Sequence, residues 1–465
     1  ILSTSYLILK GVCTASRNDW LQFAYLFQPN HFPMRPLFLS FLLLFSLAVQ
    51  GQSASEVLKF ARAEIDTLCS TTFAGRGYID NGHRKAATYL AHRFQEMGAE
   101  SMREQAAMGI ERYFQPFDFS INLIKKTSLS LNGQEMKPGL DYIVNSYSGN
   151  GLQQGKVLDL KYGLKPKASI KGKIVLFRAG WPAKIANDSE KREAYKALSR
   201  VDQRIAAILA YQPRAIIVVQ PKLTASFARE TLPLPIVEVR AESITRKVKK
   251  AAIFVEAGMT QINSQNVICQ VRGTEQPDSV IIVSAHYDHL GMQGSSIFPG
   301  ANDNASGTSM LLSMVEYFVK HPQRYTMVFI AFGAEETGLI GSNYYVNRSP
   351  VVALSQTRFI LNIDLMGNGI DGITAVGGRD FPNYFERLVA LNDTMQSVPK
   401  VKSRSNAPNS DHYFFLKNGV PGFFIYTLGG PPHYHDINDN PSTIVLSRYA
   451  EVRELLIKYL ELLNA

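Results

Sequence analysis

The stretch Ser279-Val-Ile-Ile-Val-Ser-Ala-His286-Tyr287-Asp288-His289 decides the fold, because an apolar run ends directly in a row of polar side chains. Apolar runs of about four to eight residues are typical of strands buried inside a sheet. Open α/β sheets bind their ligands beyond the carboxyl ends of such strands. The stretch therefore predicts a buried strand that places His286 and its neighbours at a functional edge.

Four more polar clusters follow apolar strands or open a helix. Because the carboxyl ends of parallel strands meet at one edge of a sheet, we expect these clusters to lie close to His286. The last cluster is in a Gly/Pro-rich loop after a strand. The clusters are Gly300–Gly307 with Asp303, Phe329–Gly338 with Glu335 and Glu336, Phe359–Gly367 with Asp364, and His433–Asp436 with His435.

The second half of the chain alternates predicted strands and helices, which is typical of an α/β fold. Residues 55–114 are predicted to be mainly helical. We therefore expect a mixed β-sheet sandwiched by helices, formed by residues 52–114 and 258–465, as the catalytic domain. The predicted strands are 279–284, 325–332, 358–363 and 422–426, and the predicted helices are 305–319, 381–391, 411–417 and 445–463.

Residues 115–257 have a different character. Short β-type runs at 156–160, 173–177 and 215–219 alternate with turns, and a helical stretch is predicted at 190–209. Few His, Asp or Glu residues cluster here. We expect an inserted, smaller α/β or β-rich domain that is accessory rather than catalytic.

The polar clusters predict a metal site, because so many buried carboxylates and imidazoles are costly without a cation. Two histidines and three carboxylates can hold two zinc ions about 3.5–4 Å apart if one carboxylate bridges them. Asp288 lies two residues after His286 and is expected to orient its imidazole. Glu335 and Glu336 are adjacent, so one is expected to bind metal and the other to act as general base.

These motifs resemble those of metallopeptidase family 28, which contains the bacterial di-zinc aminopeptidases. The resemblance covers residues 55–465 and implies a zinc-exopeptidase-like fold. It rests on His286-Tyr287-Asp288, Gly300–Gly307, Glu335-Glu336-Thr337-Gly338, Asn362–Gly367 and Tyr434-His435. The segment 115–257 resembles a protease-associated domain, especially at Ile170–Phe177, and such inserts are implied to shape substrate access or to bind partners.

The resemblance also implies a role for each site residue. Asp303 would bridge two Zn²⁺ ions, with Glu335 as general base and Tyr434 as a stabiliser of the oxyanion. His433 competes with His435 for the last ligand position, but Tyr434-His435 followed by Asp439 fits the family pattern better. Ser410-Asp411-His412 resembles the substrate-side helix start of the family, or is a plain helix cap. The remaining ligands would be His286 and Asp364 for one ion, and Glu336 and His435 for the other.

The implied activity is that of a secreted metalloexopeptidase that removes N-terminal residues from peptides. A carboxypeptidase of the same fold stays open, since Arg379 and Arg404 are available to hold a substrate carboxylate. A glutaminyl cyclase-like enzyme uses one zinc ion, so the full ligand set disfavours it. A non-catalytic binding protein on this scaffold is expected to have lost ligands, and none is lost here.

The composition excludes few classes but disfavours nucleic acid as a partner. The chain has 465 residues and a formal net charge of +10, with basic residues scattered rather than interleaved with aromatics. Its three cysteines, Cys13, Cys69 and Cys269, are too few for a disulfide scaffold. Cys69 and Cys269 are expected either to pair after export or to remain buried thiols.

The N-terminal region predicts export. Met34-Arg35 precedes the apolar run Pro36–Val49, and Gln50-Gly51-Gln52 follows it. This order is typical of a signal peptide at residues 34–51, and the run is too short to span a membrane. We therefore expect a secreted or periplasmic protein without a membrane span, with residues 1–33 left unassigned.

Overall fold

The computed structural model describes residues 53–102, 109–166 and 168–465. The predicted signal peptide, the unassigned segment 1–33 and Cys13 lie outside these residues. Residues Ala54–Ala465 form one compact unit. Among the described helices, none has an apolar stretch long enough to cross a membrane.

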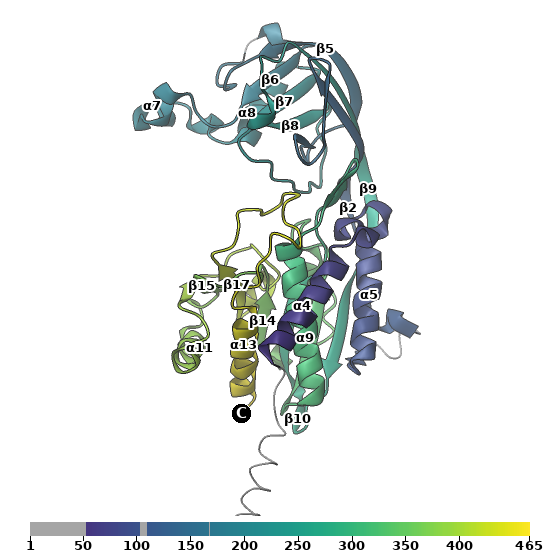
Figure 1. Cartoon of the computed structure of the whole chain (residues 1–465), viewed down its shortest axis with the longest axis vertical. Helices are drawn as coiled ribbons and strands as arrows, with labels where there is room; N and C mark the ends of the chain where they lie inside the picture. Colours follow the sequence, from purple (N-terminus) through teal and green to yellow (C-terminus); the bar gives the residue numbers. More distant parts are fainter. Residues whose placement is uncertain (1–52, 103–108, 167) are drawn as a thin grey trace, which may run out of the picture. The chain divides into compact units, whose positions relative to one another are not determined.

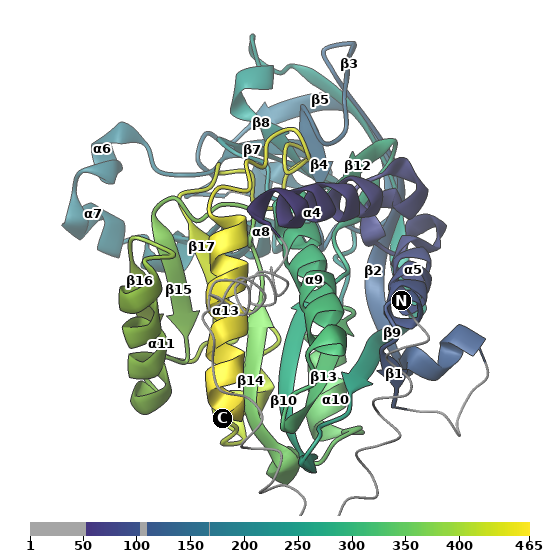
Figure 2. The same cartoon turned by 60° about the horizontal axis from the view of Figure 1, so that its bottom comes forward.

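A mixed sheet forms the centre of the region outside the predicted insert (Figures 1 and 2). Its strand order is β16-β15-β17-β14-β10-β13-β9. Strands β17, β14, β10 and β13 run parallel to one another, whereas β9 pairs antiparallel with β13 and β15 pairs antiparallel with β17. The strands are β9 (Lys250–Val271), β10 (Gln276–His286), β13 (Tyr325–Phe332), β14 (Thr357–Ile363), β15 (Gly372–Val376), β16 (Val401–Arg404) and β17 (Gly422–Leu428).

Helices cover both faces of this sheet, because side chains alternate between the faces along each strand. In β10, Ile281 and Val283 pack into one hydrophobic cluster, and Val280 and Ile282 into another. Figure 2 shows α4, α9 and α13 in front of the central strands. The first face carries α4 (Ala54–Leu68), α5 (Gly82–Glu96), α9 (Gly307–Lys320), α11 (Pro382–Met395) and α13 (Tyr449–Asn464), and the second carries α10 (Ile340–Asn347) and α12 (Tyr413–Lys417).

This architecture confirms the predicted α/β fold with a mixed sheet between helices, and all four predicted strands are present. All four predicted helices begin later than expected, α11 by one residue at Pro382. Helix α9 begins at Gly307 rather than residue 305, because Ala301–Ser306 forms an irregular turn that carries Asp303. Helix α12 begins at Tyr413, since Asp411 and His412 lie in a turn, and helix α13 begins at Tyr449, after the β-bridge of Ser447 with Asn368.

Two long antiparallel strands connect the sheet to the insert (Figure 1). Strand β2 (Phe114–Leu131) pairs with β9 from Phe114↔Val267 to Leu131↔Ala251. The predicted limits of the insert, 115 and 257, therefore fall on this ribbon, and the division of the chain into domains stays a prediction.

The insert continues the sheet through β5, which pairs antiparallel with β9, and adds a helix. The strand order is β5-β6-β7-β8-β4, parallel except for β4. Helix α8 packs through Ile205 and Ile208 against one face. The elements are β4 (Tyr142–Val144), β5 (Gly151–Asp159), β6 (Ile174–Arg178), β7 (Ala215–Gln220), β8 (Ile236–Arg240) and α8 (Val201–Leu209).

The single helix predicted at 190–209 is wrong. The chain forms α7 (Ser189–Glu193), a short turn at Lys196–Leu198 and then α8. The Asp188 carboxylate accepts a hydrogen bond from the Lys191 backbone and starts the first of these pieces. The remaining short elements are β1 (Glu100–Ser101), β3 (Gln134–Met136), β11 (Gly291–Gln293), β12 (Ser296–Phe298) and α6 (Ala183–Ala186).

Cys69 and Cys269 are free thiols. Cys269 is fully buried in β9, and burial raises its pKa well above the ordinary value. The Cys69 thiol donates a hydrogen bond to the Pro299 carbonyl, 3.3 Å away. The two cysteines therefore do not form a disulfide, and the expectation of unpaired thiols is the one that holds.

Candidate metal centre

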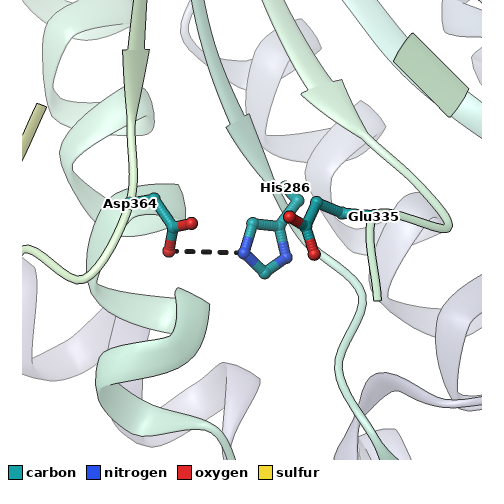
Figure 3. Close-up of side chains that lie close together, drawn as sticks. All are labelled: His286, Glu335 and Asp364. Carbon is teal, nitrogen blue, oxygen red and sulfur yellow. Dashed lines mark ion pairs between the residues drawn. The ribbon is translucent and has the colours of Figure 1, made fainter. Parts of the chain in front are cut away.

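The carboxyl ends of three neighbouring strands place the candidate ligands side by side. His286 is the last residue of β10, Glu335 and Glu336 follow β13, and Asp364 follows β14. In Figure 3 the imidazole of His286 lies between the carboxylates of Glu335 and Asp364. The prediction that the clusters share one edge is therefore confirmed by the strand register.

Asp303 lies between the two histidines of the site. Its Oδ1 atom is 3.3 Å from His286 Nε2, and its Oδ2 atom is 3.2 Å from His435 Nε2. His286 Nε2 is also 3.3 Å from Asp364 Oδ1, and His435 Nε2 is 3.0 Å from Glu336 Oε2. Each oxygen of one carboxylate thus faces a separate group of ligand atoms. We call these five residues, His286, Asp303, Glu336, Asp364 and His435, the candidate metal centre, or metal centre for short.

These distances fit the coordination of metal ions. Ligand atoms about 2.0–2.1 Å from a tetrahedral zinc ion lie about 3.3 Å from one another. The four distances of the metal centre have this length. In addition, Asp364 Oδ1 and His435 Nε2 are buried and have no hydrogen-bond partner among the described residues. The donor set therefore fits two cations that share Asp303.

Charge supports the same interpretation. Burial alone would lower the pKa of His435, but the carboxylates of Glu336 and Asp303 raise it to about 11. Burial also opposes a charge on His286, yet Asp364 and Glu335 raise its pKa well above the ordinary value. Protons held by imidazoles among carboxylates occupy the positions that divalent cations take when metal binds.

Asp288 supports the site differently from the prediction. Its carboxylate accepts hydrogen bonds from the backbone N–H groups of Glu335, at 3.0 Å, and Glu336, at 3.4 Å. The Nδ1 atom of His286 is 3.1 Å from the Asp288 carbonyl oxygen but 3.9 Å from the carboxylate. The carboxylate therefore fixes the turn of the two glutamates, and the backbone of Asp288 orients the imidazole.

Two other acidic or polar residues hold ligands in place. The Asp439 carboxylate accepts hydrogen bonds from the backbone N–H groups of Asn302 and Asp303 at 2.8 and 2.9 Å. The Ser410 hydroxyl donates to Asp364 Oδ2 at 3.2 Å. Ser410 thus orients a ligand and is more than a helix cap. Its neighbour Asp411 is fully buried, and this burial raises its pKa to about 7.

The role of His289 was not predicted from the sequence. This residue is fully buried, and its Nδ1 atom is 2.7 Å from Glu336 Oε1, so it orients Glu336 with the other oxygen toward His435. His289, Asp303 and Glu336 form one group of potential ligand atoms, and His286, Glu335 and Asp364 form another. Position 300 must be glycine, because a Cβ there would lie 2.4 Å from the His289 ring. The second histidine of His286-Tyr-Asp-His289 was the available signal.

Arg76 was also missed. Its guanidinium is fully buried and donates to the carbonyl oxygens of Tyr287, Pro299 and Gly300 at 2.8, 2.6 and 2.7 Å. It therefore ties the segment after His286 to the loop before Asp303. The flanking glycines were the available signal, since a Cβ at Gly75 or Gly77 would lie within 2.5 Å of the Gly291 backbone.

A cavity of about 250 Å³ lies over the metal centre. Glu335 and Tyr434 both line it. Tyr434 is half exposed, and its ring stacks on His435 with centroids 3.8 Å apart. His433 lies instead near Asp436, 4.0 Å from its carboxylate, so the structure brings His435 rather than His433 to the centre. Arg404 lines the same cavity, whereas Arg379 is not among its lining residues.

The chain is similar to several known peptidases. Residues 266–460 match the family described as Peptidase family M28. Aminopeptidase YwaD of Bacillus subtilis (strain 168) is 29% identical over 351 residues, which span 70% of this chain and 71% of that protein. Probable leucine aminopeptidase 2 of Aspergillus fumigatus is 27% identical over 186 residues, 38% of this chain and 36% of that protein.

A solved structure has the same fold. BSAP, a zinc aminopeptidase from Bacillus subtilis, superposes with a TM-score of 0.64 at 22% identity, covering 86% of this chain and 94% of that one. The family match contains all five residues of the metal centre, and the shared fold extends across the insert. Residues 266–460 therefore match peptidase family M28, and the chain is similar over most of its length to aminopeptidase YwaD.

Proposed function

We propose that this chain is a secreted or periplasmic aminopeptidase that uses two zinc ions to remove N-terminal residues from peptides. The observation that carries the proposal is the Asp303 carboxylate, whose two oxygens face His286 and His435 at 3.3 and 3.2 Å. The similarity to YwaD and BSAP, an aminopeptidase and a zinc aminopeptidase by their names, supports it.

The ligands divide into two sets around Asp303. His286 and Asp364 would complete one ion, and Glu336 and His435 the other. Bound zinc ions would lower the pKa of a water molecule and polarise the carbonyl of the scissile peptide bond. Asp288, His289 and Ser410 keep the ligand atoms oriented through the hydrogen bonds described above, as residues behind metal ligands do.

Glu335 would carry the proton in this reaction. It lines the cavity beside His286 and Asp364, where its carboxylate can accept a proton from the attacking water. It would return that proton to the leaving amine as the C–N bond breaks. Partial burial and the nearby carboxylates raise the pKa of Tyr434, which keeps its phenol protonated and able to donate to the developing oxyanion.

A carboxypeptidase is the second candidate, because Arg404 lines the cavity. An arginine in this place can hold a substrate carboxylate through paired hydrogen bonds. Arg404 donates a hydrogen bond to the Tyr426 hydroxyl at 3.2 Å, which places its guanidinium near the cavity wall.

One experiment separates the two activities. The mature protein is given peptides with a free or a blocked N-terminus, with and without a chelator, alongside a Glu335→Gln variant. We expect chelator-sensitive cleavage of free-amino peptides only, with the variant still binding metal but losing activity by about 10²-fold to 10⁴-fold. Cleavage of blocked peptides from the C-terminus would replace the proposal by a carboxypeptidase.

Export has its own test. The proposed signal peptide ends at Gly51, so N-terminal sequencing of the exported protein should begin at Gln52. A protein that stays inside the cell with residues 34–51 attached would contradict this part of the proposal.

A further inference from the structure

A short segment of the insert, residues 222–227, contacts the loop that carries His435. The backbone N–H of Ala225 donates to the His435 carbonyl at 3.0 Å. In return, the Ala225 carbonyl oxygen lies 2.9 Å from His435 Nδ1. One residue of the insert thus makes both a backbone and a side-chain contact with a residue of the metal centre.

These contacts determine which nitrogen of His435 is available to metal. A carbonyl oxygen only accepts, so Nδ1 must carry the proton that it donates to Ala225. The Nε2 atom, which faces Asp303 and Glu336, is then the nitrogen that can bind a metal ion. His435 also has a φ of 59°, a left-handed conformation that is unfavourable for residues with a side chain. The bond from the Ala225 N–H to its carbonyl helps to hold that conformation.

Lys222 adds a second attachment to the same loop. Its ammonium group donates to the carbonyl oxygens of Pro432, at 2.7 Å, and Tyr434, at 3.0 Å. These acceptors come three residues and one residue before His435. The loop is therefore bound to the insert on both sides of Tyr434.

The segment also packs against the other ligand-bearing loops. Leu223 and Ala225 are buried in a cluster with Leu290, Phe298 and Ile437. Leu290 follows His289, Phe298 precedes the Asp303 loop, and Ile437 follows His435. The alternate residues Thr224 and Ser226 are exposed and line a separate cavity of about 590 Å³ in the insert.

We propose that the insert is a structural part of the metal centre, in which Ala225 and Lys222 position His435 for the second zinc ion. The insert then does more than shape access to the site, because the affinity for one of the two ions depends on it. This inference rests on the proposed two-zinc function.

The test measures zinc binding to the full-length mature chain rather than catalysis. Zinc stoichiometry and affinity are determined by competition with a chelator for the unmodified protein and for four variants. Ala225→Pro removes the N–H that donates to His435, and Lys222→Met removes the ammonium group while keeping the stem. His435→Ala serves as the reference for loss of one ion. Thr224→Ala is the matched control, since Thr224 belongs to the same segment but faces away.

We expect Ala225→Pro to lower the affinity for one of the two zinc ions by about 10-fold to 100-fold, as substitution of other residues behind metal ligands does. Lys222→Met should lower the affinity for the same ion by about threefold to tenfold. Thr224→Ala should bind both ions as the unmodified protein does. Because Lys222 is exposed, its variant is expected to fold even if Ala225→Pro does not.

Two other outcomes would separate a failure of this inference from a failure of the proposed two-zinc function. If His435→Ala loses one ion while Ala225→Pro and Lys222→Met keep full affinity for both, the inference is overturned and the two-zinc proposal stands. If the unmodified protein binds fewer than two ions, or His435→Ala still binds two, the proposed function fails and this inference fails with it.

Discussion

The two halves of the metal centre are built in different ways. His286 is the last residue of β10 and Asp364 directly follows β14, and the neighbours of these buried parallel strands fix their positions. His435 lies in the long loop between β17 and α13 and is held by hydrogen bonds from the insert. Strand ends are positioned by the core, whereas a loop ligand needs partners from elsewhere. If two ions bind as proposed, we expect the ion at His286 and Asp364 to be bound more tightly than the ion at His435.

Asp303→Asn should have the largest effect, because Asp303 is shared by both halves. An amide carries no charge and offers only one oxygen, so it cannot bridge two cations. We expect kcat/KM to fall by at least about 10³-fold, equivalent to several kcal/mol of transition-state stabilisation. Steady-state kinetics measures the fall, with Asp278→Asn, an exposed carboxylate, as the control. Near-normal activity of the Asp303→Asn variant would show that a bridging carboxylate at this position is not needed.

His286→Ala and His435→Ala sharpen the comparison directly. The first removes a ligand from the strand side, the half of the metal centre with His286 and Asp364. The second removes a ligand from the loop side, the half with His435. With His435 absent, we expect one zinc ion to remain bound at His286 and Asp364 with nearly unchanged affinity. Metal analysis after dialysis against a zinc buffer gives the content of each variant. Loss of both ions from His435→Ala would mean that the strand side cannot bind metal alone.

Arg76→Met should destabilise the fold around both Tyr287 and Pro299. Two buried carbonyl oxygens, of Tyr287 and Gly300, and the partly buried one of Pro299 would lose their donor, and unsatisfied buried acceptors are costly. We expect the free energy of unfolding to fall by about 3 kcal/mol, which urea denaturation of the metal-free protein measures. Arg272→Met, at an exposed position, is the control. Equal stability of the two variants would show that Arg76 is dispensable.

The smallest expected effect is the release of protons when zinc binds. In the metal-free protein the pKa of His435 is about 11, so at pH 7.5 it is protonated and must lose a proton to bind zinc. Zinc affinity should therefore rise with pH, and binding should release protons into the buffer. Calorimetry in buffers with different ionisation enthalpies measures this release. His433→Asn should leave it unchanged, and an enthalpy independent of the buffer would contradict the prediction.

Much of the strand side could be predicted from the sequence. Apolar runs that end in polar residues predicted β10, β13 and β14, and parallel strand ends necessarily meet. The loop side could not be derived in this way, since only the resemblance to a family chose His435 over His433. The contacts of Ala225 join residues that are 210 positions apart. Such pairings depend on tertiary structure and leave no local pattern.

The same reason explains the residues that were missed or assigned differently. Arg76 binds backbone oxygens, so no complementary side chain in the sequence indicates its partners. The Asp288 carboxylate binds the backbone N–H groups of the glutamate turn, although its spacing from His286 indicated the imidazole.

The central claim is that Asp303 bridges two zinc ions. Anomalous diffraction at the zinc edge from crystals of the purified protein tests it most directly. We expect two peaks about 3.5–4 Å apart, one on either side of the Asp303 carboxylate, near His286 and His435. A single peak, or two peaks that do not share Asp303, would contradict it.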